Sequence, residues 1–271
     1  MITRTARLDA AQLDEVRALA DDVVAHDGGR LKLELSHLAV TPTEAALAHL
    51  DGRLVGFGAV YAFGGGEPEI AGMVAPARRR NGLATALLES LLPAVGSASA
   101  LLVVPAGTAA GRAFGQARRA SPSHSEHYLV LGATPAVAED PGTVVREATA
   151  DDVPDLARVL EAAFGNPAHG LRLDRPGDTT YVIERAGRLV GTVRLSVHEE
   201  WGGVYGFAVD PAEQGKGIGR DVLARACRVL RADGRSRVTL EVETQNDNAL
   251  HLYTSSGFVR EAGEDYWRVA L

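Results

Sequence analysis

The strongest constraint on the fold is an internal repeat whose period is close to half the chain. The segment Gly-Arg-Leu-Val-Gly occurs at 52–56 and again, letter for letter, at 187–191. Three further pairs of similar segments keep the same order along the chain: 8–16 with 148–156, 74–91 with 209–226, and 126–128 with 264–266. These offsets far exceed the roughly 20 to 50 residues of solenoid repeats, so we expect each copy to be a whole domain.

Length and composition agree with two domains. The chain has 271 residues and is 46% hydrophobic, which suits one large domain or two of ordinary size. Proline, glycine and acidic residues interrupt both copies between 132 and 144. We therefore expect an N-terminal domain over 1–135 and a C-terminal domain over 143–271.

Charge and cysteine content exclude several classes of protein. The net charge of −7 argues against a nucleic-acid-binding protein. The single cysteine, Cys227, cannot form an internal disulfide and lacks metal-ligand spacing, so we expect a reducing compartment and no metal. No apolar run approaches the roughly 18 residues that span a bilayer, and the first residues do not resemble a signal peptide. We expect a cytoplasmic protein without a membrane partner.

Each half is predicted to be α/β. In the second half, helices are predicted at 149–164, 218–232 and 247–256. Thr149 is the expected N-cap of the first helix, and Gly257 the expected end of the last. Strands are predicted at 143–148, 179–185, 189–197, 204–210, 237–243 and 264–271. A hairpin followed by alternating strands and helices predicts a mixed sheet with helices on both faces.

The loop between strand 204–210 and helix 218–232 indicates a phosphate site. Gly217 and Gly219 stand where the helix begins, and a helix N-terminus with closely approachable backbone amides attracts anions. The segment lacks the Gly-Lys-Ser/Thr ending of a P-loop. It also lacks the last glycine of a dinucleotide fingerprint, because Arg220 stands there. The remaining pattern is Gln-x-x-Gly-x-Gly, beginning at Gln214.

This pattern, followed by "LEVETQNDNALHLYTSSGF", resembles the GNAT superfamily of acyl-CoA-dependent N-acyltransferases. The resemblance covers 144–271 and implies two tandem domains, each with a mixed, mostly antiparallel sheet flanked by helices. It implies that acetyl-CoA is the cosubstrate and that no metal is needed. The residues it implies for cofactor binding are Phe207, Ala208, Val209, Gln214, Gly215, Lys216, Gly217, Ile218, Gly219, Arg220 and Asn246.

The resemblance also implies the acid of the reaction. Tyr253 matches the tyrosine that protonates the leaving thiolate. The base is less evident, because family members often carry a glutamate near the start of the strand, where this chain has Gly203. Glu200, just upstream, is the expected base, and a half-buried packing role stays open for Tyr253.

The first half is a less complete copy. It keeps a loop with Arg79, Gly82 and Ala84, but it offers neither the asparagine nor the tyrosine, and Phe114 is the nearest aromatic residue. We expect this half to be structural rather than catalytic. A pair with one active and one degenerate half is similar to tandem GNAT proteins of the mycothiol synthase type.

The expected activity is transfer of an acetyl group to the primary amine of a small molecule or peptide. The irregular segment 163–178 is expected to build the acceptor site, and the protein is expected to be a monomer or homodimer. Two alternatives stay open: a sensor that binds acyl-CoA without catalysis, and an N-acetyltransferase acting on a larger protein partner.

Overall fold

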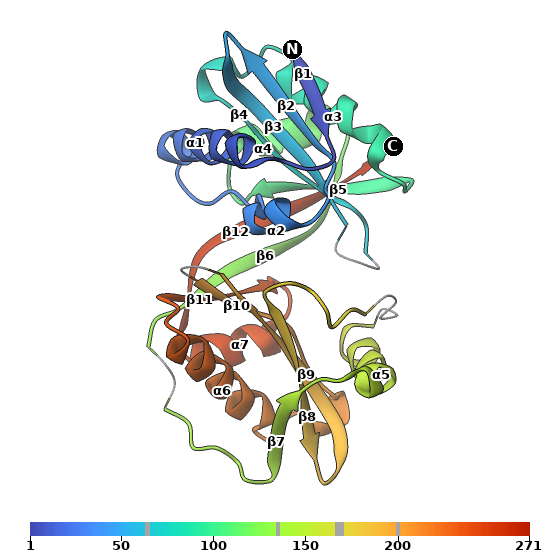
Figure 1. Ribbon diagram of the computed structural model, residues 1–271, viewed down its shortest axis with the longest axis vertical. Coiled ribbons are helices and arrows are strands. Elements are labelled where there is room, and N and C mark those ends of the chain that lie inside the picture. Colours follow the sequence, from blue (N-terminus) through green and yellow to red (C-terminus); the bar gives the residue numbers. More distant parts are fainter. Residues whose placement is uncertain (63–65, 134–135, 166–170, 199–200) are drawn as a thin grey trace. The chain divides into compact units, whose positions relative to one another are not determined.

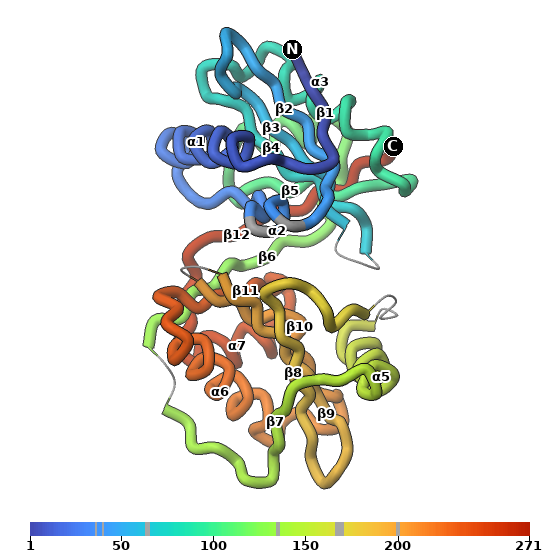
Figure 2. Tube along the Cα trace, in the orientation of Figure 1, coloured from blue at the N-terminus to red at the C-terminus, as the bar shows by residue number. Residues whose placement is uncertain are grey.

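The chain forms two compact units in a computed structural model that describes residues 1–62, 66–133, 136–165, 171–198 and 201–271 (Figure 1). The first unit comprises Met1–Ser125 together with Ala262–Leu271, and the second comprises Glu126–Glu261. Figure 2 shows the red C-terminal segment among the blue and green elements of the first unit. In the described residues no helix is long and apolar enough to cross a membrane.

The first unit is a sheet covered by helices. Its strands are β1 (Ile2–Thr5), β2 (Ala45–Leu50), β3 (Arg53–Tyr61), β4 (Glu69–Val74), β5 (Ser99–Pro105), the end of β12 (Phe258–Ala270) and the start of β6 (Ser121–Leu131), in that spatial order. Its α-helices are α1 (Ala10–Asp27), α2 (Leu35–Val40), α3 (Leu83–Leu91) and α4 (Ala109–Ala117). The strands β4 and β5 pair in parallel. The pairs β1 with β2, β2 with β3, β3 with β4, and β5 with β12 are antiparallel. Helices α1 and α2 pack on one face, and α3 packs on the other.

The second unit repeats this plan. Its strands are β7 (Thr143–Glu147), β8 (Asp178–Arg185), β9 (Arg188–Val197), β10 (Trp201–Val209), β11 (Arg237–Glu243), the end of β6 and the start of β12. Its α-helices are α5 (Val153–Phe164), α6 (Ile218–Ala232) and α7 (Asp247–Ser255). Only the β10–β11 pair is parallel among the registers described. Helices α6 and α7 pack on one face and α5 on the other (Figure 1).

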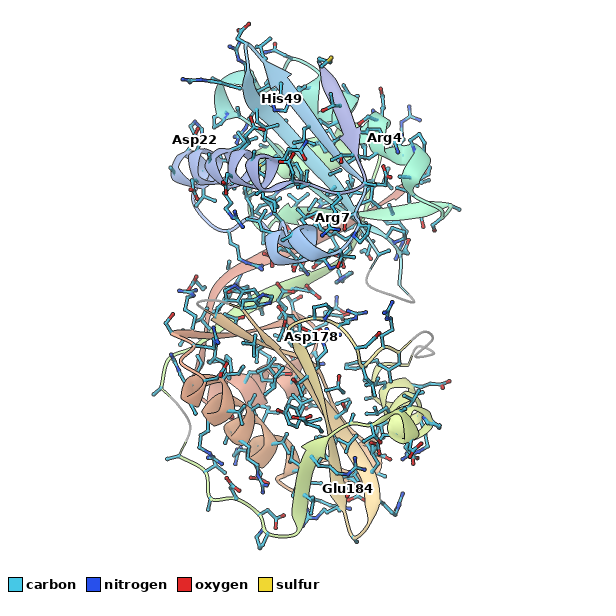
Figure 3. All side chains as sticks on the ribbon, viewed as in Figure 1. Arg4, Arg7, Asp22, His49, Asp178 and Glu184 are labelled. Carbon is cyan, nitrogen blue, oxygen red and sulfur yellow. The ribbon has the colours of Figure 1, made fainter. Side chains whose placement is uncertain are left out.

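The helix and strand order of the second half is therefore the one expected from the sequence. The β8–β9 hairpin turns through Ala186 and Gly187, both at positive φ (49° and 73°), which is the two-residue turn that suits twisted strands. Thr149 begins the helical segment with a capping box to Asp152. Gly257 follows α7 at φ 90°, the left-handed conformation that ends a helix. Asp178 is the first residue of β8, and Glu184 precedes its last residue (Figure 3).

The last strand differs from the expectation. Residues 264–271 are expected to close the second domain, but Glu264–Ala270 of β12 pair with Pro105–Ser99 of β5 in the first unit. Conversely, Glu126–Val130 of β6 pair with Glu243–Thr239 of β11 in the second unit. The expected domains 1–135 and 143–271 thus differ from the compact units, because each unit contains one strand encoded by the other half.

Buried polar contacts tie β12 into the first unit. Arg30 Nη1 lies 2.7 Å from Glu264 Oε1, and the Glu264 side chain is almost fully buried. Lys32 Nζ donates to the Tyr266 hydroxyl at 2.6 Å. The segments Glu126–Tyr128 and Glu264–Tyr266, which form one of the repeated pairs, therefore occupy equivalent positions in exchanged sheets.

Candidate active site

The parallel strands β10 and β11 of the second unit separate partway along their length. Trp201–Val204 pair with Arg237–Leu240, and the described register stops there. On its other edge, β10 has a β-bulge between Tyr205 and Ala208, and Gly206 adopts a φ of 51°. The last five residues of β10 therefore have no partner in this register, and this opening in the β10–β11 pairing leaves backbone groups of Phe207–Val209 available to a ligand.

The loop after β10 has the geometry expected of an anion site. Gly215 and Gly217 have φ values of 77° and 84°, and an added Cβ at either would meet nothing within 4 Å, so they are needed for their backbone conformation. Gly217 precedes α6 without a side-chain cap, which leaves the first amides of the helix to a ligand or solvent. Gln214 Nε2 donates to the Val209 carbonyl at 3.0 Å and so holds the loop against the strand end.

The third glycine has a different purpose. A Cβ at Gly219 would lie 3.2 Å from Leu252 Cδ2 and 4.0 Å from Phe207 Cζ. Gly219 therefore allows the first turn of α6 to approach α7 and β10 closely. Lys216, by contrast, is half exposed and pairs with Glu213 at 2.8 Å.

Helix α7 brings Tyr253 into the same core. Tyr253 is only 8% exposed and lies in one buried cluster with Ile218, while Phe207 and Leu252 pack against that cluster. Its ring meets Phe258 edge-on at 6.1 Å. Burial raises the pKa of the Tyr253 phenol to about 12, so the group keeps its proton at neutral pH.

Asn246 and Glu200 are placed less directly. The Asn246 side chain accepts a hydrogen bond from the Ala249 amide at 3.1 Å and is the N-cap of α7. Its observed contact is therefore structural, since it starts the helix that carries Tyr253. Glu200 lies outside the described residues, as do 166–170 of the expected acceptor segment.

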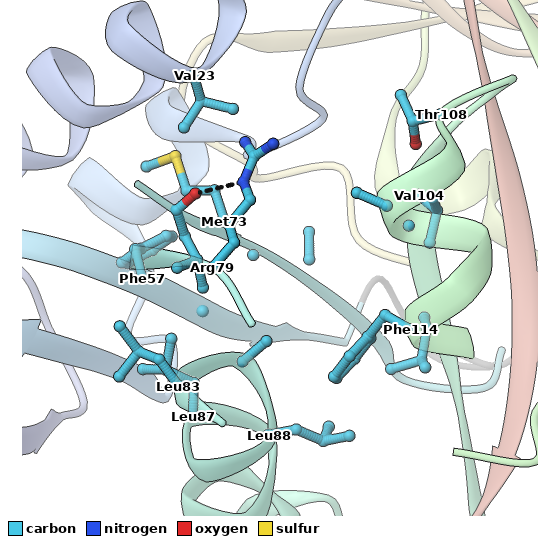
Figure 4. A pocket seen from close by; sticks show the side chains of 18 of the residues that line it. Val23, Phe57, Met73, Arg79, Leu83, Leu87, Leu88, Val104, Thr108 and Phe114 are labelled. Carbon is cyan, nitrogen blue, oxygen red and sulfur yellow. Dashed lines mark hydrogen bonds between the residues drawn. The ribbon is translucent and has the colours of Figure 1, made fainter. Parts of the chain in front are cut away.

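The first unit keeps the same loop with other side chains. Arg79 Nε donates to the Val74 carbonyl at 3.1 Å, just as Gln214 donates to Val209 (Figure 4). Gly82 precedes α3 at φ 78° and ψ −2°, nearly the values of Gly217. Arg80 holds a φ of 65° where the second unit has Gly215. The loop conformation is thus conserved between the halves although its residues differ.

A cavity of about 420 Å³ lies beside this loop. Its walls are mainly apolar and include Met73, Leu83, Leu88 and Phe114 (Figure 4). Sequence reasoning did not foresee the ion pair at its edge, in which the Arg79 guanidinium contacts both Asp27 carboxylate oxygens at 2.8 and 2.6 Å. That pair lowers the pKa of Asp27 to about 2.

The described part of the first unit lacks two features of the second, the β-bulge before the loop and the buried tyrosine. The β3–β4 register runs without a break from Gly56–Val74 to Tyr61–Glu69, so the described part of β4 has no bulge. Helices α4 and α7 both have nine residues after their N-caps, Thr108 and Asn246. Counting from these caps, Gly115 stands at the Tyr253 position, and a Cβ there would lie 3.2 Å from the Trp267 ring.

Phe114 therefore corresponds to Leu252 rather than to Tyr253. Phe114 lines the cavity, and it does not occupy the position that corresponds to Tyr253. Counting from the helix caps in the sequence gives this correspondence, because Thr108 and Asn246 are both residues that favour N-caps.

Comparisons with known proteins agree with this geometry. The model of the acetyltransferase (GNAT) family matches residues 17–114 and 146–258, once in each half. The mycothiol acetyltransferase of Nocardia farcinica is 31% identical over 94% of this chain and 93% of its own length. That of Clavibacter michiganensis subsp. michiganensis is 32% identical over 92% and 87%.

Solved structures share the fold at lower identity. A GCN5-related N-acetyltransferase from Sphaerobacter thermophilus has a TM-score of 0.77 at 18% identity, and the match covers 99% of this chain and 95% of that one. A tandem GNAT protein from the clavulanic acid biosynthesis pathway has a TM-score of 0.72 at 18% identity, with 100% and 98% covered. With a family match in each half and relatives above 30% identity over nearly the whole chain, this protein belongs to the GNAT family of acetyltransferases.

Proposed function

We propose that the second unit transfers an acetyl group from acetyl-CoA to the primary amine of a small molecule, by direct attack of the amine on the thioester. The observation that carries this proposal is the convergence of the open end of β10, the Gly217 loop and buried Tyr253 in one core. Relatives are named mycothiol acetyltransferase, so the unacetylated form of mycothiol is the first acceptor to test.

The residues present fit acetyl-CoA. The capless start of α6 and the glycines before it suit a pyrophosphate, because amides and the helix dipole favour an anion there. The edge of β10 beyond Val204 suits the amide groups of pantetheine. The proposed binding residues are Phe207, Ala208, Val209, Gln214, Gly215, Lys216, Gly217, Ile218, Gly219, Arg220 and Asn246.

The reaction needs one proton donor and one proton acceptor. Acetyl-CoA supplies the carbonyl that the amine attacks and the thiol that departs. As the new C–N bond forms and the C–S bond breaks, Tyr253 gives its phenol proton to the sulfur. Backbone N–H groups at the open end of β10 donate to the carbonyl oxygen. For the acceptor of the amine proton the sequence predicts Glu200, and the proposed steps need no metal.

A transfer assay with a panel of amines tests the proposal. Release of the CoA thiol, followed with acetyl-CoA and each amine, should be fastest with a small amine acceptor. If acetyl-CoA binds but no amine causes release of the CoA thiol, the protein is a sensor that binds acyl-CoA without catalysis. Release with lysine-bearing or N-terminal peptides alone would indicate a protein acceptor.

A further inference from the structure

The face of the second unit's sheet opposite Tyr253 carries a partly buried cation, Arg194, whose side chain is 29% exposed. Arg194 lies in β9 between Val193 and Leu195, which are 2% and 3% exposed and belong to the core. Its Nε is 3.3 Å from Asp178 Oδ2, yet Nε makes no hydrogen bond within the described residues. Burial lowers the pKa of Arg194. A buried N–H group left without a hydrogen bond costs stability, which points to a role in function.

Tyr205 is the partner of Arg194 across the sheet. The two residues are opposite each other in the β9–β10 register, and Arg194 Cζ lies 5.5 Å from the centre of the Tyr205 ring. Tyr205 is also the first residue after the last β10–β11 pair. Val204 packs in the core with Tyr253, so Tyr205 points to the other face of the sheet at the same opening.

The ring of Tyr205 covers Gly203. A Cβ at Gly203 would lie 2.3 Å from Tyr205 Cε2 and 3.1 Å from its hydroxyl oxygen. The phenol thus stands where a side chain at 203 would have to begin, the position at which the family resemblance leads us to expect a glutamate. In the first unit the matching register position is Glu69, because Glu69 pairs with Tyr61 and Leu101 as Gly203 pairs with Ser196 and Thr239.

We propose that Tyr205 replaces that glutamate and takes the proton from the attacking amine, and that Arg194 and Asp178 are its positioning residues. This inference rests on the proposed function. The amine nitrogen forms its bond to the carbonyl carbon, its proton passes to the Tyr205 phenolate oxygen, and the C–S bond breaks as Tyr253 protonates the sulfur. The base and the acid then act at one opening from opposite faces of the sheet.

Other titratable groups lie on the strands next to Tyr205. Asp178 and the preceding Arg175 accompany Arg194 on the β8 side. Glu241 of β11 and its register partner Tyr128 of β6 share the same face, since Leu240 points into the core. His198 contacts Ser196 Oγ at 3.0 Å, and burial lowers its pKa. The positive charge of Arg194, 5.5 Å from the centre of the ring, favours the phenolate.

Single substitutions assayed in the full chain test the proposal. Tyr205→Phe should lower kcat by roughly 100-fold while acetyl-CoA affinity stays within about twofold. Tyr181→Phe removes a hydroxyl from β8 in the same unit and is the matched control, expected near the parent value. Arg194→Met should move the alkaline-rising limb of the kcat–pH profile to higher pH, because the phenolate loses its neighbouring cation.

A rescue experiment separates chemistry from folding. Tyr205→Ala should lose activity, and adding Gly203→Glu to it should restore at least tenfold, because removing the ring frees the space for the carboxylate. Normal kcat in Tyr205→Phe, with loss in Glu200→Gln, overturns the proposal for Tyr205 alone. Absence of transfer by the parent chain with every amine overturns the proposed function and this inference together.

Discussion

The two loop–helix junctions of this protein have nearly the same backbone and different chemistry. Gly82 and Gly217 cap their helices at φ 78° and 84°, and Arg79 and Gln214 donate to strand-end carbonyls at 3.1 and 3.0 Å. Yet, in the described residues, only the second unit has a bulged strand before the loop and a buried tyrosine on the next helix but one, α7. The comparison teaches that a binding-loop conformation can persist without the residues that catalyse.

The largest expected effect comes from cutting the chain at the boundary that the sequence predicts. A fragment of residues 143–271 lacks Glu126–Val130, which pair with β11, and we expect it to show no cooperative thermal transition by circular dichroism. A fragment of residues 126–261 keeps that strand and should retain native-like secondary structure. Cooperative folding and acetyl transfer by 143–271 would show that the exchanged strand is dispensable.

Removing the hydroxyl of Tyr253 should abolish the catalytic difference between the two halves. Tyr253→Phe removes the proton donor, so we expect kcat to fall by roughly 100-fold while acetyl-CoA binding is nearly unchanged. Phe114→Leu in the first unit is the matched control and should leave kcat close to that of the parent. Stopped assays of thiol release and calorimetric titration measure the two quantities. Normal turnover in Tyr253→Phe would show that Tyr253 contributes to core packing and not to proton transfer.

Matched glycine substitutions compare the two loops directly. Gly217→Val and Gly82→Val each force a branched residue into the left-handed region, at a cost of roughly 1–3 kcal/mol in unfolding free energy. We expect Gly217→Val to weaken acetyl-CoA binding about tenfold or more. Gly82→Val combined with Arg79→Ala should keep transfer within about threefold of the parent. Loss of activity in that double variant, with Tyr253→Phe active, would assign catalysis to the first half.

The smallest expected effect is a pH dependence of the unfolding free energy that arises from the Arg79 loop of the first unit and not from the Gln214 loop of the second. Arg79 lowers the pKa of Asp27 from its ordinary value near 3.8 to about 2. The ion pair therefore stabilises the fold fully above about pH 4, and its contribution is lost as the pH falls through 2. Arg79→Ala should lower the unfolding free energy by about 1 kcal/mol at neutral pH, and the difference should shrink over that acid range.

Gln214→Ala is the comparison for that measurement, because Gln214 is uncharged and donates only to a carbonyl. Its effect on unfolding free energy, from urea denaturation at each pH, should not change between pH 4 and 2. Equal pH dependence in both variants would show that the Asp27 pair is not the source.

Much of the fold could be predicted from the sequence because its signals are local. The Ala186–Gly187 turn, the Thr149 cap and Gly257 after α7 each depend on residues that are neighbours in the chain. The loop glycines were also found from spacing alone. Of the candidate site, the cofactor loop and Tyr253 came from the resemblance, and their roles stay predictions.

The polar cluster around Arg194 was missed, although a signal was present. In β9 the residues Thr192, Arg194 and Ser196 alternate with apolar ones, which places Arg194 on one face of the strand with Thr192 and Ser196. Its importance depends on Tyr205 and Asp178, which lie on neighbouring strands. That contact follows from the register of three strands, and no local pattern gives the register.

By itself, the sequence determined the repeat, the order of helices and strands in the second half, and the positions of the loop glycines. Only the tertiary structure decided where the two similar segments Glu126–Tyr128 and Glu264–Tyr266 pair. Either segment has the alternation and the residues to fit either sheet, so the choice is made by pairing between residues far apart in the chain. The same is true of the bulge at Gly206, because it is defined by its partner strand as much as by its own residues.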